Sequence, residues 1–533
     1  MEKLKALPIG IQGFRNIIEG DYVYADKTEY VYSLLNDAKY YFLSRPRRFG
    51  KSLLLDTIAE VFSGDKELFK GLYIYDSDYE FEKYPVIRFD MSNIANKTPE
   101  VLETAIREHL EAYYAREGFD VQSDSPSSQF KFLIEALCEK YKKRVVVLID
   151  EYDKPILDVL TDEDIAKANR SVLSGFYGVL KSMDSFLRFT FITGVSKFTK
   201  TSVFSGLNNL LDITMMEDYA NICGIPPDEL NGVFREHVVS LSGMKQLSHI
   251  ENIHDEIIAW YDGYSWDGET RVLNPFSLLT FFRKKQFSSY WYSTGTPRFL
   301  LDLIKNRPEG YTDLSNFELG EMSMDTFEIG RVEVEPLLFQ TGYLTVKEVI
   351  PYEAPPVYLV DIPNREVRLA FNLHILSDFA GSSVNIAETS YRRIKQALES
   401  GNLSEMLLHM KALFSSIPYQ LHIGREAYYH SIFYAMLNLY GFEINAEVST
   451  SGGRLDADLE LADKVYIFEF KYVDCSPEAT EGEKAEMFSK ILDDAMNQIK
   501  AKGYADKYIG SGKTVYKAAF AFLGRDNIEM RVE

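Results

Sequence analysis

One segment combines residue types that can bind phosphate. Gly50, Lys51 and Ser52 stand between the apolar run "YYFLS" and the helical pattern "SLLLDTIAEVF". The start of a helix directs backbone N–H groups and a positive dipole end at an anion. There a lysine reaches the β- and γ-phosphates of a nucleotide, and a hydroxyl group binds Mg²⁺. The consensus loop has a glycine five residues before Gly50, where this chain has Arg45. By itself, the segment is therefore equally consistent with a basic loop before a helix.

A second segment supplies the acids that such a site needs. The run "RVVVLIDEYD" is apolar and β-branched, and it contains Asp150 and Glu151 at its end. At a strand tip, Asp150 can hold Mg²⁺ through water and Glu151 can polarise the attacking water as a catalytic residue. By itself the pair is also typical of an acidic helix cap. Together with Gly50, Lys51 and Ser52, it predicts a site for ATP and Mg²⁺.

The predicted nucleotide site extends beyond these residues. The later apolar run "FLRFTFITG" reaches Thr193 and leads to Ser196; a polar side chain there either senses the γ-phosphate or belongs to a plain turn. Ser52 and Asp150 are the predicted Mg²⁺ ligands. The residues predicted to bind the nucleotide are Arg45, Pro46, Arg47, Arg48, Phe49, Gly50, Lys51, Ser52, Leu53 and Asp150.

The strand pattern "KVYIFEFKYV" places two ionisable residues in an apolar setting. Alternate residues of a strand face opposite sides, so Glu469 and Lys471 share a face with Val465 and Ile467. Both faces are mostly apolar, which predicts a buried strand. Burying the two charges costs free energy unless they pair or bind a ligand. An ordinary Glu–Lys pair is one interpretation.

The preceding strand favours a second interpretation. If residues 462–463 form the tip of a hairpin, Asp456 lies opposite Glu469, with Cβ atoms about 4.5–5.5 Å apart. Two carboxylates at that distance repel unless a cation lies between them, and Mg²⁺ binds one or two carboxylates with water and phosphate oxygens. Lys471 would orient or deprotonate the attacking water. The pattern thus predicts metal-dependent phosphodiester hydrolysis, with Asp456 and Glu469 as metal ligands and all three residues catalytic.

Three regions must position these residues. Residues 1–215 alternate apolar strand patterns with helical ones, which predicts a parallel sheet with helices on both faces. Residues 216–415 are mostly helical, and "VYLVDI" and "EVRLAF" around "PN" predict a hairpin there. Residues 416–533 predict the order helix, three strands, helix, strand, with the first helix ending at Gly441.

Composition limits what these regions can do. The 533 residues carry a net charge of −22, which argues against a broad surface that coats nucleic acid. Residues 416–533 alone hold 13 basic and 19 acidic residues, a net of −6, so a basic wall would come from elsewhere. No apolar run is long enough to span a membrane, and the start of the chain lacks the apolar core of a signal peptide. We expect a cytoplasmic protein without a membrane partner.

Several motifs together resemble a known family. "LPIGIQGF", "YVYADKTEYV", "FLSRPRRFGKSLLL", "LIDEYDKPI", "TGVSKF", "NPFSLL", "GRLD" and "YIFEFKY" look like bacterial AAA-ATPase-like proteins with a C-terminal PD-(D/E)xK nuclease-like domain. The resemblance covers nearly the whole chain and makes "RPRRFGK" a phosphate-loop variant of that family. It implies an α/β fold with three parts: a P-loop AAA-like ATPase domain (1–215), a helical, winged-helix-like middle region (216–415) and a restriction-endonuclease-like α/β domain (416–533). It also implies supporting roles for Glu426 and Gln498, with Gln498 counted among the catalytic residues.

Two functions follow from these patterns. In the first, ATP binding and hydrolysis regulate a metal-dependent nuclease, with nucleic acid as substrate and DNA favoured over RNA. In the second, the chain is a nucleotide-dependent switch whose nuclease fold only binds. ATP hydrolysis in this class often uses an arginine from a neighbouring subunit, so a homo-oligomer is expected. Arg47, Arg48 and Arg188 are all candidates for that arginine.

Overall fold

A computed structural model describes most of the chain. The described residues are 4–533 without 122, 198–202, 205–206, 208, 249, 292–316, 325–328, 330–333, 351–354, 380–383, 416–443, 451–452, 477–478, 502–504, 509 and 524–526. Inside helices and strands, side chains are also not described at 322, 375–376, 378–379, 384–388, 415, 444–450 and 453–456. The described residues divide into two compact units, one within 1–291 and 316–364 and the other within 365–533.

The first unit is built on a parallel sheet of five strands. Their order across the sheet is β2, β3, β4, β1, β5. The bounds are β1 Tyr40–Ser44, β2 Val86–Asp90, β3 Val145–Asp150, β4 Leu187–Gly194 and β5 Leu211–Asp212. Strands β1, β2, β3 and β4 lie in the apolar runs "YYFLS", "YPVIRFDM", "RVVVLIDEYD" and "FLRFTFITG", which confirms the parallel sheet predicted for residues 1–215. Because the strands are parallel, the carboxyl ends of β1, β4 and β3 meet at one edge of the sheet, where α/β proteins bind ligands.

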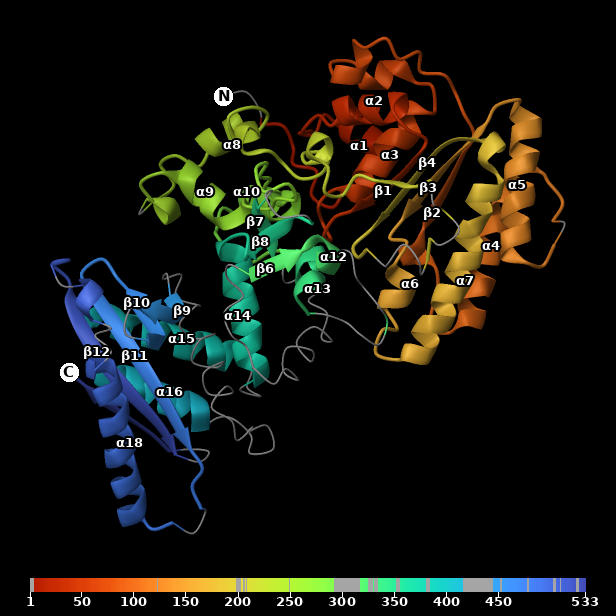
Figure 1. Ribbon diagram of the computed structural model, residues 1–533. Coiled ribbons are helices and arrows are strands. Elements are labelled where there is room, and N and C mark those ends of the chain that lie inside the picture. Colours follow the sequence, from red (N-terminus) through yellow and green to blue (C-terminus); the bar gives the residue numbers. More distant parts are fainter. Residues whose placement is uncertain are drawn as a thin grey trace. The chain divides into compact units, whose positions relative to one another are not determined.

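Helices cover both faces of this sheet (Figure 1). The helices are α1 Phe14–Glu19, α2 Thr28–Asn36, α3 Lys51–Val61, α4 Pro99–Glu117, α5 Pro126–Tyr141, α6 Lys154–Leu157 and α7 Glu163–Ser182. On one face, Phe62 after α3 packs on Phe189 of β4. On the other, Phe89 of β2 contacts Phe130 of α5 and Phe176 of α7. The apolar strands are thus buried between two helical layers.

The rest of the first unit is helical with one small sheet. Its helices are α8 Arg235–Val239, α9 Ile253–Tyr261, α10 Pro275–Lys284, α12 Glu321–Met324 and α13 Val334–Thr341. The strands β6 Phe317–Gly320, β7 Thr345–Ile350 and β8 Val357–Asp361 form an antiparallel sheet in the order β6, β8, β7. The Asn274 side chain accepts the Ser277 N–H and caps α10, so "NPFS" begins a helix.

The hairpin predicted around residues 363–364 is wrong. Residues 357–361 form β8, but helix α14, Arg365–Phe379, follows in place of a second strand. Val367, Ala370 and Phe371 are buried, and their spacing of three and four residues places them on one helix face. Strand β8 pairs with β6 and β7 instead. A short apolar run does not distinguish a strand from a buried helix segment.

The second unit contains a mixed sheet of five strands. Its strands are β9 Ile444–Thr450, β10 Gly453–Glu460, β11 Lys464–Val473, β12 Thr514–Leu523 and β13 Asn527–Val532, in the order β13, β12, β11, β10, β9. Only β11 and β12 run parallel. Strand β13 lies beyond the last strand expected from the sequence. The helix predicted over residues 425–441 lies outside the described residues.

Helices pack on both faces of this second sheet as well. Helix α18, Glu481–Ala501, buries Leu492, Ala495, Met496 and Ile499 against the face that carries Val465 and Ile467. The helices α15 Val384–Ser400 and α16 Leu403–Ser415 meet the opposite face, where Tyr466 donates to the Leu398 carbonyl and Phe414 contacts Phe522. Strand β11 is therefore buried on two sides, as the apolar pattern predicted.

Candidate functional site

The phosphate loop leaves β1 and enters α3 in a strained conformation. Gly50 has φ of 96°, a left-handed value that favours glycine, and caps the start of α3. Arg48 in the loop and Glu151 after β3 also have positive φ, 68° and 53°. Such backbone costs free energy in residues with a side chain, and it concentrates at functional sites. Both strained residues lie at the edge where the carboxyl ends of β1 and β3 meet.

Lys51 is buried within the loop that it follows. Its side chain is 3% exposed, and its ammonium donates to the carbonyl oxygens of Arg45 at 3.0 Å and Pro46 at 3.1 Å. The nearest carboxylate oxygen, from Glu151, is 3.7 Å away. The lysine is therefore held by the loop's own backbone, with only one loose ion pair. A buried cation at the start of α3 favours an anionic ligand.

Asp150, at the end of β3, connects the start of α3 to the neighbouring strand β4. One of its carboxylate oxygens accepts from the Ser52 hydroxyl at 2.5 Å, and the other accepts from the Thr193 hydroxyl at 2.6 Å and the Glu151 N–H at 3.0 Å. Burial raises the pKa of Asp150, and the charge of Lys51 and these hydroxyl donors partly oppose that shift. The predicted Mg²⁺ ligands Ser52 and Asp150 are thus in direct contact. Thr193 contacts Asp150.

Asp153 is a residue that the sequence reasoning missed. Its buried carboxylate accepts from the N–H of Val195 at 3.1 Å and from the N–H and the hydroxyl of Ser196, each at 2.6 Å. Burial and the nearby charge of Glu151 raise the pKa of Asp153 to about 6. The residue therefore fixes the end of β4, which carries Thr193. Its position three residues after Asp150 in "DEYD" was the available signal.

The remaining predicted nucleotide residues differ in exposure. Arg45, Pro46 and Phe49 are buried, Arg47 and Leu53 are half-buried, and Arg48 is exposed. Arg188 begins β4 at the opposite, amino end of the sheet, where its guanidinium lies 5.8 Å from the Tyr84 ring centre. Of the three candidate arginines, Arg47 and Arg48 therefore belong to the phosphate loop of their own chain, whereas Arg188 lies at the far end of the sheet.

A small apolar cavity adjoins the phosphate loop. Its volume is about 100 Å³, and Phe49, Gly50 and Leu53 form the wall on the loop side. The other lining residues are Pro8, Ile17, Val23, Tyr24, Ala25, Lys27, Leu54, Ile222, Cys223, Gly224, Ile225, Phe234, Pro275 and Leu279. Burial lowers the pKa of Lys27 to about 8. One cationic side chain thus borders an otherwise largely apolar space beside the loop.

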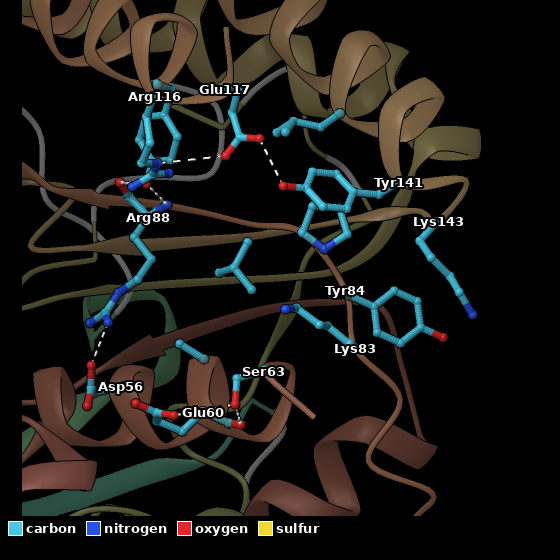
Figure 2. Close-up of a pocket in the computed structure, with 15 residues that line it drawn as sticks. Asp56, Glu60, Ser63, Lys83, Tyr84, Arg88, Arg116, Glu117, Tyr141 and Lys143 are labelled. Atoms are coloured by element: carbon cyan, nitrogen blue, oxygen red, sulfur yellow. Dashed lines mark hydrogen bonds and ion pairs between the residues drawn. The ribbon is translucent and has the colours of Figure 1, made fainter. Parts of the chain in front are cut away.

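A larger cavity, about 530 Å³, lies at the opposite end of the sheet (Figure 2). Its carboxylates already have partners, because Asp56 pairs with Arg88, Glu60 with Arg15, and Glu117 with Lys140. The C-terminal ends of α3, α4 and α5 border it through Ser63, Glu117 and Tyr141. Helix C-termini favour nearby cations, which accounts for Lys83, Arg116 and Lys143 in its wall. Ion pairs and helix C-termini thus account for the charged residues around this cavity without a ligand.

The second candidate site is centred on a buried carboxylate. Glu469 of β11 is fully buried, and one of its oxygens lies 3.1 Å from the Lys471 ammonium. The Lys471 side chain is 33% exposed, so the lysine can reach water while the glutamate cannot. On neighbouring β10, buried Asp458 accepts from the Tyr508 hydroxyl at 2.7 Å. Burial, and after it the contact with Asp458, raises the pKa of Tyr508.

The strand register supports the geometry assumed for the second site. Ala457 faces Phe468 and Glu460 faces Val465, which is the alignment of the expected hairpin. The next position along β10 is Asp456, whose side chain lies outside the described residues, so its contact with Glu469 stays a prediction. Gln498 is half-buried on α18. Glu426 lies outside the described residues. Among the residues whose side chains are described, no cluster of three His, Cys, Asp or Glu could hold a metal ion.

Two known protein families match this chain, one in its N-terminal part and one in its C-terminal part. The family described as "Predicted AAA-ATPase" matches residues 8–204, and the "PD-(D/E)XK nuclease superfamily" matches residues 424–531. A protein of Azotobacter chroococcum mcd 1, named "Uncharacterized protein in vnfD 5'region", is 38% identical over 524 residues, which are 97% of this chain and 96% of that protein. In the described part of the chain, no helix is both long and apolar enough to cross a membrane.

Proposed function

Because this chain belongs to the family of proteins that join an AAA-ATPase-like domain to a PD-(D/E)XK nuclease-superfamily domain, we propose that it is an ATP-regulated nuclease. The first unit binds and hydrolyses ATP with Mg²⁺. The C-terminal domain cleaves phosphodiester bonds of nucleic acid, DNA rather than RNA, with a divalent metal. The nucleotide state of the first unit controls that cleavage.

The hydrogen bond between Ser52 and Asp150 carries the ATPase proposal. At 2.5 Å it joins the phosphate loop to the acidic end of β3, the two parts that jointly bind Mg²⁺ in P-loop NTPases. Lys51, the residue before Ser52, contributes the positive charge for the β- and γ-phosphates. Glu151 is 3.7 Å from that lysine and would polarise the attacking water. Ser52 and Asp150 would hold Mg²⁺, which would supply positive charge beside the phosphates.

The small cavity beside the loop supports a place for the nucleoside. Phe49, Gly50 and Leu53, which are also predicted to bind the nucleotide, form its wall on the loop side, and the rest of the wall is largely apolar. A purine presents a flat apolar face and several hydrogen-bond acceptors at its edge, and the cavity offers an apolar wall and Lys27 as a donor. At about 100 Å³ it has room for little more than a base, which leaves ribose and phosphates toward the loop.

The nuclease proposal is supported by Glu469 and Lys471. A fully buried carboxylate beside a partly exposed ammonium suits a divalent metal and the water that the metal activates. Asp456 is proposed as the second ligand, since the register from Ala457 to Glu460 leads to it. Gln498 is proposed as a supporting residue, because α18 packs on the face of β11 that carries Val465 and Ile467.

One assay tests the whole proposal. Purified protein is incubated with end-labelled DNA and RNA, with and without ATP and with Mg²⁺, Mn²⁺ or EDTA. Metal-dependent cleavage that changes with ATP is the expected result. The Glu151→Gln variant should bind ATP without hydrolysing it. With ATP present, its cleavage activity is therefore expected to stay at the level of the ATP-bound state. Lys51→Ala should make cleavage insensitive to ATP. Cleavage that is equal with and without ATP in all three proteins would refute the regulation.

A second function, a nucleotide-dependent switch with a binding-only nuclease fold, is favoured by two observations. The C-terminal region is acidic, with 13 basic and 19 acidic residues, and Glu469 and Lys471 already form an ion pair. This function predicts ATP hydrolysis without cleavage of either nucleic acid under any metal condition. ATP-dependent retention of labelled DNA without product would then identify the switch.

A homo-oligomer is proposed as the ATP-hydrolysing form. Arg47 and Arg48 lie in the phosphate loop, and ATPases of this class often take an arginine from a neighbouring subunit. We expect light scattering to show a larger species when an ATP analogue is bound. A strict monomer in both conditions contradicts the proposal, and turnover that rises more than in proportion to protein concentration supports it.

A further inference from the structure

Arg45 occupies the position at which the consensus phosphate loop has glycine, and it is fully buried. Its guanidinium donates to the carbonyl oxygens of Ser44 at 2.9 Å, Thr214 at 2.8 Å and Tyr219 at 3.2 Å. The guanidinium carbon lies 3.8 Å from the Trp266 ring centre. The side chain therefore joins the end of β1 to two other segments of the same unit, residues 214–219 and the segment around Trp266.

The neighbouring loop residues contact the same part of the unit. The Trp291 indole donates to the Arg47 carbonyl at 2.9 Å, and the Phe49 carbonyl accepts from the Gly224 N–H at 3.1 Å. The Phe49 ring also packs edge-on against Trp266, with ring centres 5.7 Å apart. The loop is thus attached along its length to residues 214–291, and Arg45 makes the deepest of these attachments.

The position of Arg45 also determines where Lys51 can lie. The Lys51 ammonium donates to the carbonyl of Arg45 itself and to that of Pro46. Those carbonyls point at the lysine only while the loop keeps its present course. Arginine is suited to fixing it, because its planar group can donate to several carbonyls and stack on a ring at once.

The buried charge of Arg45 has no carboxylate within ion-pair distance among the described residues. Burial accordingly lowers the pKa of Arg45 to about 10. A buried cation without such a partner costs free energy, and the three carbonyls and the Trp266 ring offset that cost. Glycine would remove the cost, the three hydrogen bonds and the stacking together, and would leave a cavity at the base of the loop.

We propose that Arg45 is a positioning residue for phosphate binding: held by three carbonyls and Trp266, it sets the loop so that Lys51 is presented to the phosphates. The inference rests on the proposed nucleotide site. Under this proposal, the segment 264–291, which contains Trp266 and Trp291, helps to hold the phosphate loop in place. It also predicts that restoring the consensus glycine weakens the site, whereas a loop that merely tolerates arginine would bind as well or better with glycine.

The test measures the part of nucleotide affinity that depends on the phosphates. Dissociation constants for ATP and AMP are determined by calorimetry for wild type, Arg45→Gly, Arg45→Lys and Trp266→Leu. The preference for ATP over AMP is expected to fall by about tenfold or more in Arg45→Gly, the scale of one charge-assisted hydrogen bond. Arg45→Lys and Trp266→Leu are expected to give smaller losses of the same kind.

Trp260→Leu is the matched control, since Trp260 lies in the same helical part, on α9, and packs on Phe287. Its preference for ATP over AMP should equal that of wild type. A loss of stability alone would weaken ATP and AMP equally, so an unchanged preference in Arg45→Gly, or in Arg45→Lys and Trp266→Leu if the glycine variant does not fold, overturns the inference. Wild type that binds no ATP would instead refute the nucleotide site itself.

Discussion

The two candidate sites pair a lysine with a glutamate in opposite senses. In the first unit the lysine is the buried partner, with Lys51 3% exposed and Glu151 20% exposed at 3.7 Å. In the second unit the glutamate is the buried partner, with Glu469 fully buried and Lys471 33% exposed at 3.1 Å. A buried cation supported by backbone carbonyls favours an anionic ligand, and a buried carboxylate favours a cation. Under the proposed function, the same residue pair serves a phosphate in one site and a metal in the other.

The carboxylates of the two sites also differ in their own hydrogen bonds and ion pairs. In the first unit, the acids at and just after the end of β3 have their own donors, because Asp150 accepts from Ser52 and Thr193, and Asp153 accepts from Val195 and Ser196. In the second unit, Glu469 forms an ion pair with Lys471, two residues along the same strand. Removing one member of each pair should therefore have unequal consequences, and the following experiments use that inequality.

The largest effect is expected from Lys51→Ala, which should reduce ATP hydrolysis by roughly a hundredfold or more. The lysine supplies the charge for the β- and γ-phosphates, and loss of one such donor costs about 10²–10³ in turnover. Phosphate release measures the effect, and circular dichroism checks that the fold is retained. Lys154→Ala, which removes a lysine paired with Asp158 four residues on, is the control. Equal turnover in the two variants would remove Lys51 from the site.

The next effect concerns the buried anion. Lys471→Met should lower the free energy of unfolding by about 3 kcal/mol in EDTA, because it takes the lysine from a fully buried carboxylate. Glu469→Gln should cost about 1 kcal/mol or less, since Lys471 can reach water and repulsion from Asp456 is relieved. Urea unfolding measures both values. Equal losses would contradict the assignment of Glu469 as the buried partner.

Metal extends the same experiment. Mn²⁺ should raise the melting temperature of wild type and restore part of the loss in Lys471→Met, because a bound cation replaces the missing positive charge. It should barely change Glu469→Gln or Asp456→Asn, which each lack a proposed ligand. If Mn²⁺ shifts every variant as much as wild type, the metal site is wrong and the second unit retains only its Glu–Lys pair.

A third prediction concerns pH and the buried carboxylate of Asp153. Burial raises the pKa of Asp153 to about 6 in the folded protein, above its ordinary value, so the folded state holds the proton more strongly. The resulting stability is fully present below about pH 4 and is lost as the pH rises through 6, by roughly 3 kcal/mol for a shift of about two units. Asp153→Asn should remove that part of the pH dependence in urea unfolding between pH 4 and 7. The same slope in both proteins would refute it.

The smallest effect is expected from Thr193→Val. Asp150 loses one of three donors but keeps Ser52 and the Glu151 N–H, so affinity for Mg²⁺–ATP should fall by about fivefold, equivalent to about 1 kcal/mol. Thr190→Val on the same strand is the control, because its buried hydroxyl has no hydrogen-bond partner in the described part of the chain. It should leave affinity unchanged. A larger loss in the control than in Thr193→Val would contradict the role of Thr193.

Much of the fold could be predicted because the relevant signals are local. The runs that became β1, β2, β3 and β4 are apolar and bounded by helical patterns, and period-two alternation placed Glu469 and Val465 on one face of β11. Hairpin length alone led to the register in which Ala457 faces Phe468. The hairpin prediction after Pro363 was wrong because the local signal there is ambiguous. The six residues "EVRLAF" do not distinguish a strand from the first turns of α14.

The sequence by itself determined which residue types stand at the strand ends, and therefore that phosphate and metal chemistry were available. Only the tertiary structure decided which member of each Lys–Glu pair is buried, because burial depends on helices and strands far away in the chain. It likewise decided that Arg45 donates to Thr214 and Tyr219 and stacks on Trp266, contacts that span more than 160 residues. Local pattern carries no information on such contacts, since packing between distant segments creates them.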